Sequence, residues 1–507
     1  MTTHDRAFKI AIIGIYAVVL IIIAQNLQYP YLMFDEAVQF WISKGLNPDS
    51  EPLSATAGIG AVIENNKYYN MDPGGFGILL HFWAGISNNY VWLRVLPFLL
   101  YLGVVLCFIY LSFKWTNNIN IALLIGFIPI LYPLLLTMGF EIRAYSMETL
   151  GVTLCIASLE NLKKRINSAN LFAWASVFSV FMTSRYSLVL VVFVTSLYIL
   201  YLLATASINT KQKLIALAAY SLPLLATLIF VYRNALIYQN NNISPLIYIQ
   251  YLRDAPELLL KPQALLYLGS MLLLIVALLL KNTYPVIKKY SGLLVIALGV
   301  NLLFLILSFL GMHPWVPAFT FRANRCISMI TLMVLCYAAL LGELLGSAFA
   351  SPGRVQYYVV PLLLMLVFFV RKDALLPRLI PLTIKETESS YAITNNVQLD
   401  FAKHRIDSMQ KIYVDWGNSP FTKYWYEYGP LKSEVGKSYP AKFTFTNTGR
   451  HGFYEGAKDV EFFKGNKNHT DTNEVDHYDL IIAGKKPEKD KWRLMDAASN
   501  FWIKGNN

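Results

Sequence analysis

The feature that most constrains this chain is a series of apolar runs, each about 20 residues long, which is the length a helix needs to cross the hydrocarbon core of a bilayer. The first run extends from Phe8 to Leu27, and comparable runs recur up to about residue 370. Backbone amides in lipid must find their hydrogen bonds within the same segment. The chain is therefore predicted to be a mainly α-helical, polytopic membrane protein.

The composition supports this fold class. Of the 507 residues, 56% are hydrophobic and 15% are charged, whereas about 25% of the residues in a typical soluble domain are charged. The net charge of +12 comes from basic residues spread over short loops, which is typical of cytoplasmic loops and does not indicate nucleic acid. The four cysteines lie in or beside apolar runs, so neither a disulfide framework nor a zinc site is expected.

The apolar runs predict about eleven membrane spans. The first run is too long for a signal peptide and lacks a small-residue cleavage site, so it is expected to remain in the protein. Loops expected on the cytoplasmic side are basic, as in Lys163-Lys164-Arg165, and this bias orients a membrane protein with its N-terminus inside and its C-terminus outside. The predicted spans are residues 8–27, 91–113, 120–138, 146–162, 170–184, 186–203, 213–231, 263–280, 291–310, 327–346 and 355–370.

A further apolar stretch, GGFGILLHFWAGI at residues 74–86, is too short to cross the bilayer. Its His81 and Trp83 suit a helix that lies at the membrane surface. We expect this helix to belong to a long first outer loop, residues 28–90. If it crossed the membrane, every later basic loop would face the opposite side.

The composition changes near residue 371, where charged residues become frequent and Gly, Asn and Pro are interspersed. Short runs typical of strands follow at 411–416, 442–447 and 478–484. The chain is therefore predicted to have two domains, a transmembrane domain at residues 1–370 and a small extracytoplasmic α/β domain at residues 371–507.

In this topology the charged residues of the outer loops follow an order, with the acids early in the chain and the arginines late. Charges at membrane depth are costly and usually mark a site or a pathway. Carboxylates that face arginines suit a reaction in which a nucleophile loses a proton and an anionic phosphate leaves. The outer polar residues are Asp35, Glu36, Asp72, Glu141, Arg143, Arg185, Arg233, Arg253, Asp254, His313, Arg322 and Arg325.

Four motifs follow one another along the chain: FDEAVQFWISKG at 34–45, Asp-Pro-Gly-Gly at 72–75, Leu-Arg-Val-Leu-Pro at 93–97 and KIYVDWGNSPFTKYWYEYG at 411–429. Their order resembles that of the polyprenyl-phosphate-dependent glycosyltransferases of the membrane-embedded GT-C type. The most similar branch contains the protein O-mannosyltransferases and the bacterial aminoarabinose transferases that modify lipid A. The resemblance covers most of residues 8–430 as a pattern of topology and short motifs.

The resemblance implies an acidic residue in the first outer loop and two surface helices there, the second opening with a proline motif. Where the family usually has two prolines, this chain has Pro73-Gly74-Gly75. The lysine that binds phosphate in the aminoarabinose transferases has no counterpart at that point. Either Lys67 or arginines elsewhere would then hold the phosphate.

Asp35 is the main catalytic candidate. As a general base it would deprotonate an incoming hydroxyl or amine, which would attack the anomeric carbon of the sugar and invert its configuration. The alternative is that Asp35 caps a helix over residues 36–44. Glu36 is a second catalytic candidate, or it faces water in the first helical turn.

Glu141 is a third catalytic candidate, since it could orient the acceptor or hold a divalent cation, Mg or Mn, together with Asp35. Its alternative role is an ion pair with Arg143. Asp72 either binds substrate or caps the second surface helix, with Pro73 in the first turn.

Arg322 and Arg325 are the best candidates for the phosphate of the donor, because guanidinium groups bind phosphate through paired hydrogen bonds. Their alternative role is to anchor the chain at lipid headgroups. The remaining substrate-binding candidates are Lys67, Tyr69, Arg143, Arg185 and His313.

The predicted function is an inverting glycosyltransferase of a bacterial plasma membrane, with its active site on the extracytoplasmic side. It would transfer a hexose or pentose from a polyprenyl-phosphate donor to a glycolipid, a surface glycan or a protein. An external site has no nucleotide sugars, and the chain has no Gly-rich nucleotide loop. The alternatives are a transporter or flippase of a lipid-linked saccharide, and a polymerase or ligase of surface polysaccharide.

Overall fold

The computed structural model describes residues 3–28, 32, 34–46, 58–69, 72–237, 262–309 and 326–349, together with Tyr424 and five short strands beyond residue 411. The chain divides into two compact units. The first unit contains Met1–Gln25, Met71–Phe76 and Val95–Pro377, and the second contains Asn26–Asn70, Gly77–Arg94 and Arg378–Asn507. The domain boundary expected at residue 370 lies outside the described residues.

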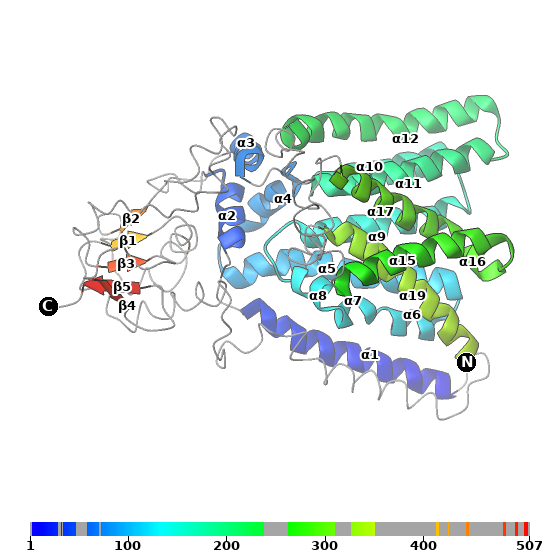
Figure 1. Ribbon diagram of the computed structural model, residues 1–507, viewed down its shortest axis with the longest axis horizontal. Helices are drawn as coiled ribbons and strands as arrows, with labels where there is room; N and C mark the ends of the chain where they lie inside the picture. Colours follow the sequence, from blue (N-terminus) through cyan, green and yellow to red (C-terminus); the bar gives the residue numbers. More distant parts are fainter. Residues whose placement is uncertain are drawn as a thin grey trace. The chain divides into compact units, whose positions relative to one another are not determined.

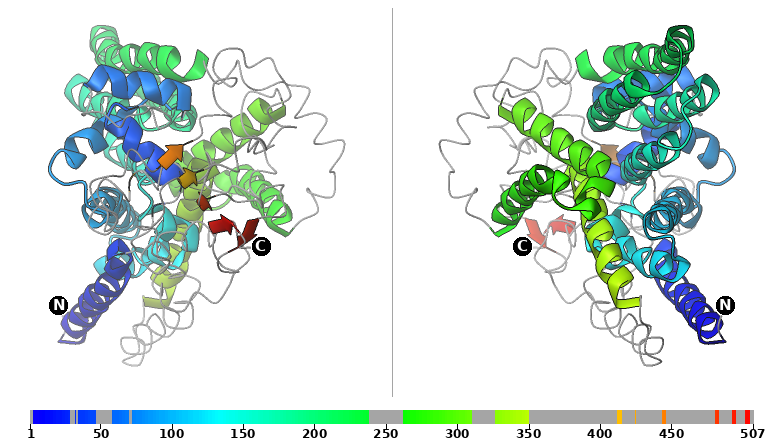
Figure 2. Two further views of the ribbon diagram at one scale, coloured as in Figure 1. Left: turned by 90° about the vertical axis from the view of Figure 1, so that its left-hand side faces the viewer. Right: turned by 90° about the vertical axis from the view of Figure 1, so that its right-hand side faces the viewer.

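The first unit is helical. Figure 1 labels its helices and Figure 2 shows them from both ends. Among the residues that the structure describes, five helical segments are long and apolar enough to cross a membrane, at Arg6–Gln28, Tyr90–Thr116, Tyr186–Thr205, Thr210–Leu236 and Ile327–Gly346. This confirms a mainly helical chain that is compatible with an integral membrane protein. Most of η1 (Gln25–Gln28) and the first residues of α5 (Tyr90–Thr116) belong to the second unit. The other helices of the first unit are α1 (Thr3–Ala24), α6 (Ile119–Ile125), α7 (Ile128–Leu131), α8 (Pro133–Met138), α9 (Tyr145–Leu162), α10 (Ser168–Met182), α11 (Tyr186–Thr205), α12 (Thr210–Val231), η2 (Tyr232–Leu236), α15 (Pro262–Leu279), η4 (Leu280–Asn282), α16 (Pro285–Lys289), α17 (Ser291–Phe309) and α19 (Ile327–Phe349).

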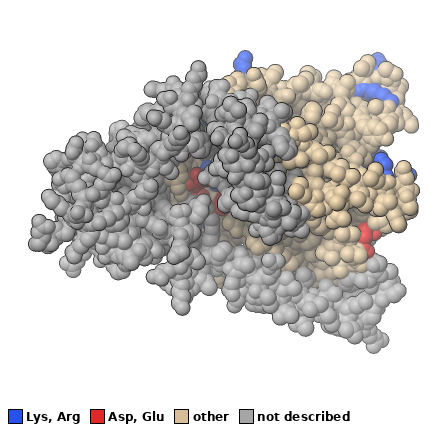
Figure 3. Space-filling model, in the orientation of Figure 1, with Lys and Arg blue, Asp and Glu red and all other residues tan. Residues whose placement is uncertain are grey.

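Helix α9 lies at the centre of this unit, where it packs against α10, α11 and α19. Most of its residues are buried, and they join one large apolar core. The outer helices instead expose leucines, such as Leu222 of α12 at 67% and Leu272 of α15 at 61%. Figure 3 shows that the described surface on the face in view is almost free of charged atoms. An apolar outer surface of this kind suits contact with lipid.

One predicted span differs from the structure. Residues 120–138 were expected to form one helix, but they form the three short helices α6, α7 and α8. Pro129 and Pro133 lie within the first turn of α7 and of α8. Proline has no backbone N–H and suits the first turn of a helix, where that donor would have no partner within the helix, so both prolines are placed where a new helix starts. The predicted span at 355–370 lies outside the described residues.

The second unit contains helices of the first loop, α2 (Phe34–Ser43), α3 (Ile59–Tyr69) and most of α4 (Gly75–Ala84). Helices α2 and α4 correspond to the two expected surface helices, whereas α3 was not predicted. The Nδ1 atom of His81 lies 2.7 Å from the carbonyl oxygen of Ser43, so α4 contacts the end of α2. Trp83 and Trp92 stack with ring centroids 4.3 Å apart, and each indole N–H donates to the backbone carbonyl of the other residue.

The described part of the C-terminal segment forms one five-stranded sheet in the order β2-β1-β3-β5-β4. Strand β1 is parallel to β2 and to β3, and β5 is antiparallel to β3 and to β4. The first three strands lie within the three stretches predicted from sequence, and β4 and β5 were not predicted. Their bounds are β1 (Ile412–Val414), β2 (Phe443–Phe445), β3 (Leu480–Ile482), β4 (Trp492–Leu494) and β5 (Phe501–Lys504).

The Asp-Pro-Gly-Gly motif docks onto the turn between α10 and α11. The backbone N–H of Gly75 donates to the carbonyl oxygen of Thr183 over 2.8 Å. A Cβ atom on Gly75 would lie 1.9 Å from the Oγ1 atom of Thr183 and 2.8 Å from its carbonyl oxygen. Gly74 has a φ of 97°, a conformation that favours glycine. The two glycines therefore let this segment approach Thr183 closely.

We expect Gly75→Ala to destabilise the protein by about 1–3 kcal/mol, because the added methyl group must push Thr183 away. Thermal unfolding of the purified protein in detergent would measure the change. Gly269→Ala is the control, since Gly269 lies on an exposed part of α15 with no atom within 4 Å of the added Cβ. If both variants unfolded at the wild-type temperature, the docked geometry would be wrong.

Candidate functional site

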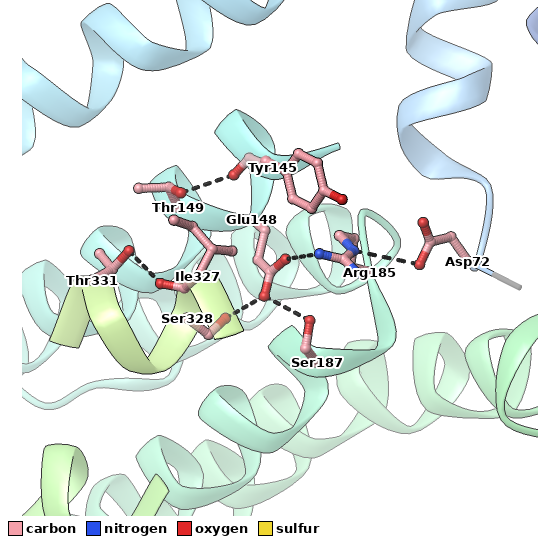
Figure 4. A network of polar contacts seen from close by, with 9 residues as sticks. All are labelled: Asp72, Tyr145, Glu148, Thr149, Arg185, Ser187, Ile327, Ser328 and Thr331. Carbon is pink, nitrogen blue, oxygen red and sulfur yellow. Dashed lines mark hydrogen bonds and ion pairs between the residues drawn. The ribbon is translucent and has the colours of Figure 1, made fainter. Parts of the chain in front are cut away.

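The first residues of α9, α11 and α19 meet at a buried polar network in the first unit (Figure 4). Glu148 lies in the first turn of α9 and is fully buried. Its carboxylate accepts hydrogen bonds from the hydroxyl groups of Ser187, the second residue of α11, and of Ser328, the second residue of α19. The N-terminal ends of helices carry partial positive charge, so they favour an anionic group at this point.

Arg185 joins Glu148 to the Asp-Pro-Gly-Gly motif. It lies just before α11 in an extended conformation, with φ −151° and ψ 147°. Its Nη1 atom is 3.2 Å from an oxygen of Glu148, and its Nε atom is 3.6 Å from Oδ1 of Asp72. The guanidinium carbon lies 4.7 Å from the centre of the Tyr145 ring, which adds a cation–π contact.

The side chain of Arg185 is only 8% exposed, so its charge depends on these neighbours. Burial lowers the pKa of Arg185, but the charges of Glu148 and Asp72 outweigh burial and leave the pKa above its ordinary value. The guanidinium group is therefore charged at any physiological pH. The positive charge of Arg185 thus lies between two acidic side chains, those of Glu148 and Asp72.

A second buried ion pair lies in the second unit. Both side chains of Glu36 and Arg94 have 0% exposure. Nη1 and Nη2 of Arg94 donate to the two oxygens of Glu36 over 2.6 and 3.1 Å. This paired geometry fixes the start of α2 against the first turns of α5. Glu36 does not face water, as one of its expected roles required.

Asp35 precedes Glu36 in the first turn of α2 and is exposed to solvent. The two adjacent carboxylates therefore have different surroundings, because one is enclosed with Arg94 and the other is accessible. An accessible carboxylate on a helix that a buried ion pair holds in place is suited to contact a substrate. The general-base role of Asp35 stays a prediction.

The remaining acidic candidate of the first unit, Glu141, is buried at 7% exposure. Its backbone carbonyl accepts a hydrogen bond from the amide of Arg143 in the turn before α9. The guanidinium carbon of Arg143 lies 5.8 Å from the centre of the Tyr145 ring. Glu141 and Asp35 belong to different units, so the cation that they were expected to share stays a prediction. Within the described ranges, no group of three or more His, Cys, Asp or Glu residues is placed to hold a metal ion.

The other substrate-binding candidates lie apart from the network or outside the described residues. Lys67 of α3 forms an ion pair with Glu64, one helical turn earlier. Tyr69 is the last residue of α3. His313, Arg322 and Arg325 lie outside the described residues.

The sequence predicted Asp72 and Arg185 as two separate substrate-binding candidates. It did not predict Glu148, which shares Arg185 with Asp72. It also missed Ser187 and Ser328, and it placed Arg94 in the Leu-Arg-Val-Leu-Pro motif without its pairing with Glu36. A signal for two of these residues exists in the sequence, because Glu148 and Arg94 are single charges at the edges of long apolar runs. The two serines carry no such signal, since a buried helix accommodates serine without a special role.

Comparison of this chain with models of protein families, with curated proteins and with solved structures finds no match. The resemblance to membrane-embedded glycosyltransferases therefore stays a prediction from the sequence motifs.

Removing one partner of a buried ion pair leaves the other charge without compensation. We expect Arg94→Ala to lower the free energy of unfolding by about 3–5 kcal/mol, because Glu36 would remain buried. Arg94→Lys should lower it less, since a lysine keeps the charge but not the paired hydrogen bonds. Denaturant or thermal unfolding in detergent would measure both changes.

Lys163→Ala is the matched control, because the ion pair of Lys163 with Glu160 is partly exposed, at 29% and 16%. We expect that variant to change the stability by less than about 1 kcal/mol. Equal effects of Arg94→Ala and Lys163→Ala would contradict the enclosed Glu36–Arg94 pair.

Proposed function

We propose that this protein is an inverting glycosyltransferase that moves a sugar from a polyprenyl-phosphate donor to an acceptor on the extracytoplasmic side of a membrane. The acceptor is a glycolipid, a surface glycan or a protein hydroxyl. The observation that carries the proposal is the contrast between two neighbouring carboxylates. Asp35 is accessible, while Glu36 is enclosed with Arg94 and holds the helix that presents Asp35.

In the proposed reaction, Asp35 accepts the proton of the acceptor's hydroxyl or amine as that group attacks the anomeric carbon. A bond forms between the acceptor and the anomeric carbon. The bond from that carbon to the phosphate oxygen breaks, and its electron pair leaves with the polyprenyl phosphate. Attack opposite to the leaving group inverts the anomeric configuration.

The proposal includes eleven spans, an outer first loop and an outer C-terminal α/β domain. Two contacts support this topology. The predicted spans that begin near residues 146, 186 and 327 all start on the outer side, and the first turns of α9, α11 and α19 contact one another at Glu148. Within the second unit, the hydroxyl of Tyr424 donates to the carbonyl of Asn88 in the first loop over 2.8 Å. Two segments in contact lie on the same side of a membrane.

The donor's phosphate needs cationic partners on the outer side. In this proposal Arg322, Arg325 and Arg185 are the arginines available to it, and the membrane is a bacterial plasma membrane. The lipid-linked donor explains how an outer active site obtains an activated sugar without nucleotides.

The proposal is tested by incubating the purified protein with a panel of polyprenyl-phosphate sugars and candidate acceptors. We expect the wild type to consume one of these donors. Asp35→Asn should lower the rate of transfer by about 100-fold or more, because general-base catalysis contributes about 10²–10⁴-fold. Glu160→Gln, at the opposite end of α9 from Glu148, should transfer at the wild-type rate.

Full activity of Asp35→Asn would overturn the assignment of the base. Accumulation of a lipid-linked saccharide across vesicles without any sugar transfer would favour the transporter or flippase. Consumption of a lipid-pyrophosphate oligosaccharide instead of a monophosphate donor would favour the polymerase or ligase.

A further inference from the structure

We propose that Asp72 occupies the position on Arg185 that the donor's phosphodiester takes when it binds. The inference rests on the proposed function and assigns the phosphate of the donor to the buried network of the first unit. The ligand class is a lipid-linked phosphodiester with a single negative charge.

The two carboxylates beside Arg185 are held differently. Glu148 lies 3.2 Å from Nη1, within the range of a hydrogen bond, and it also accepts from Ser187 and Ser328. Oδ1 of Asp72 lies 3.6 Å from Nε. This distance is longer than a hydrogen bond, so the contact is an ion pair held by the attraction of the two charges. On Arg185, Glu148 therefore takes the shorter, hydrogen-bonded position and Asp72 takes the longer one, and we place the exchange with another anion at the longer one.

Guanidinium groups bind phosphate oxygens through paired N–H donors, and the edge formed by Nε and one terminal nitrogen is suited to such a pair. A phosphate in place of Asp72 would approach the Nε side of Arg185. The first turn of α11 begins directly after Arg185, so its backbone amides add partial positive charge there.

The turn that carries Arg185 has a further donor. The hydroxyl of Ser184 is buried and has no hydrogen-bond partner among the residues that the structure describes. A buried hydroxyl of this kind is usually satisfied in some state of a protein. A phosphate bound at the adjacent Arg185 would bring acceptor oxygens to this turn.

Charge balance also favours the exchange. A sugar linked to a polyprenol through phosphate is a phosphodiester with one negative charge, so it replaces Asp72 without changing the net charge beside Glu148. The product is a polyprenyl monophosphate, whose second proton leaves near pH 6. The second negative charge repels Glu148 and favours release of the product.

The test measures binding of a short polyprenyl methyl phosphodiester to the full-length protein in nanodiscs, with the neutral polyprenol of equal length as the control ligand. We expect Asp72→Asn to bind the phosphodiester about tenfold more tightly than the wild type, because a competing anion is gone and couplings between sites commonly reach this size. The affinity for the polyprenol should not change. Glu160→Gln, which removes a carboxylate at the other end of α9, should leave both affinities unchanged.

Arg185→Gln should lower the affinity for the phosphodiester about tenfold or more, but this variant also removes the partner of Glu148 and could fail to fold. The Asp72→Asn variant keeps the pair of Arg185 with Glu148, so its affinity for the phosphodiester is sufficient to test the inference. Unchanged or weaker binding by Asp72→Asn would overturn the inference.

The binding assay needs no catalysis, so the two proposals fail in different ways. If Asp72→Asn binds the phosphodiester more tightly and the wild type transfers no sugar, the proposed phosphodiester site on Arg185 is supported and the proposed glycosyltransferase function is rejected. If the wild type transfers sugar and Asp72→Asn leaves the affinity for the phosphodiester unchanged, the proposed glycosyltransferase function is supported and the proposed phosphodiester site on Arg185 is rejected.

Discussion

Arg185 is buried among apolar helices, and its charge is stable there because Glu148 and Asp72 lie beside it. The desolvation of a guanidinium group is costly, and nearby carboxylates with further hydrogen bonds must offset that cost. These contacts tie together the beginnings of α9, α11 and α19 and the segment before α4. The positions of several helix ends thus depend on one charged group, and the docking of Gly75 on Thr183 brings Asp72 to it.

A buried ion pair between an arginine and a carboxylate also occurs in the second unit, where Arg94 pairs with Glu36. The burial of Glu36 leaves Asp35 as the accessible member of the acidic pair. In the proposed enzyme, the buried carboxylates hold structure and the exposed carboxylate performs chemistry. This division explains why two adjacent acids follow the first long apolar helix, since one acid alone would not serve both purposes.

The sequence predicts elements whose signal is local. The apolar runs predicted most of the long helices, and the acidic and proline motifs predicted α2 and α4. These signals, the length of an apolar run and the residues at its ends, lie within the segment that they describe. The break of 120–138 into three helices was missed, although Pro129 and Pro133 mark it. The partnership of Glu148 with Arg185 was also missed, because contacts between residues distant in sequence leave no local pattern. The Asp-Pro-Gly-Gly motif was recognised, but its contact with Thr183 needs the fold.

The most direct test of the account is the side of the membrane on which residue 35 lies. Asp35→Cys in intact cells would be treated with a membrane-impermeant maleimide, with the wild type measuring the background from Cys107, Cys155, Cys326 and Cys336, all buried or half-buried. Lys163→Cys, in a loop predicted to be cytoplasmic, is the opposite control. We expect Asp35→Cys to react in intact cells and Lys163→Cys to react only after the cells are opened. Reaction of Asp35→Cys only in opened cells would contradict an outer active site.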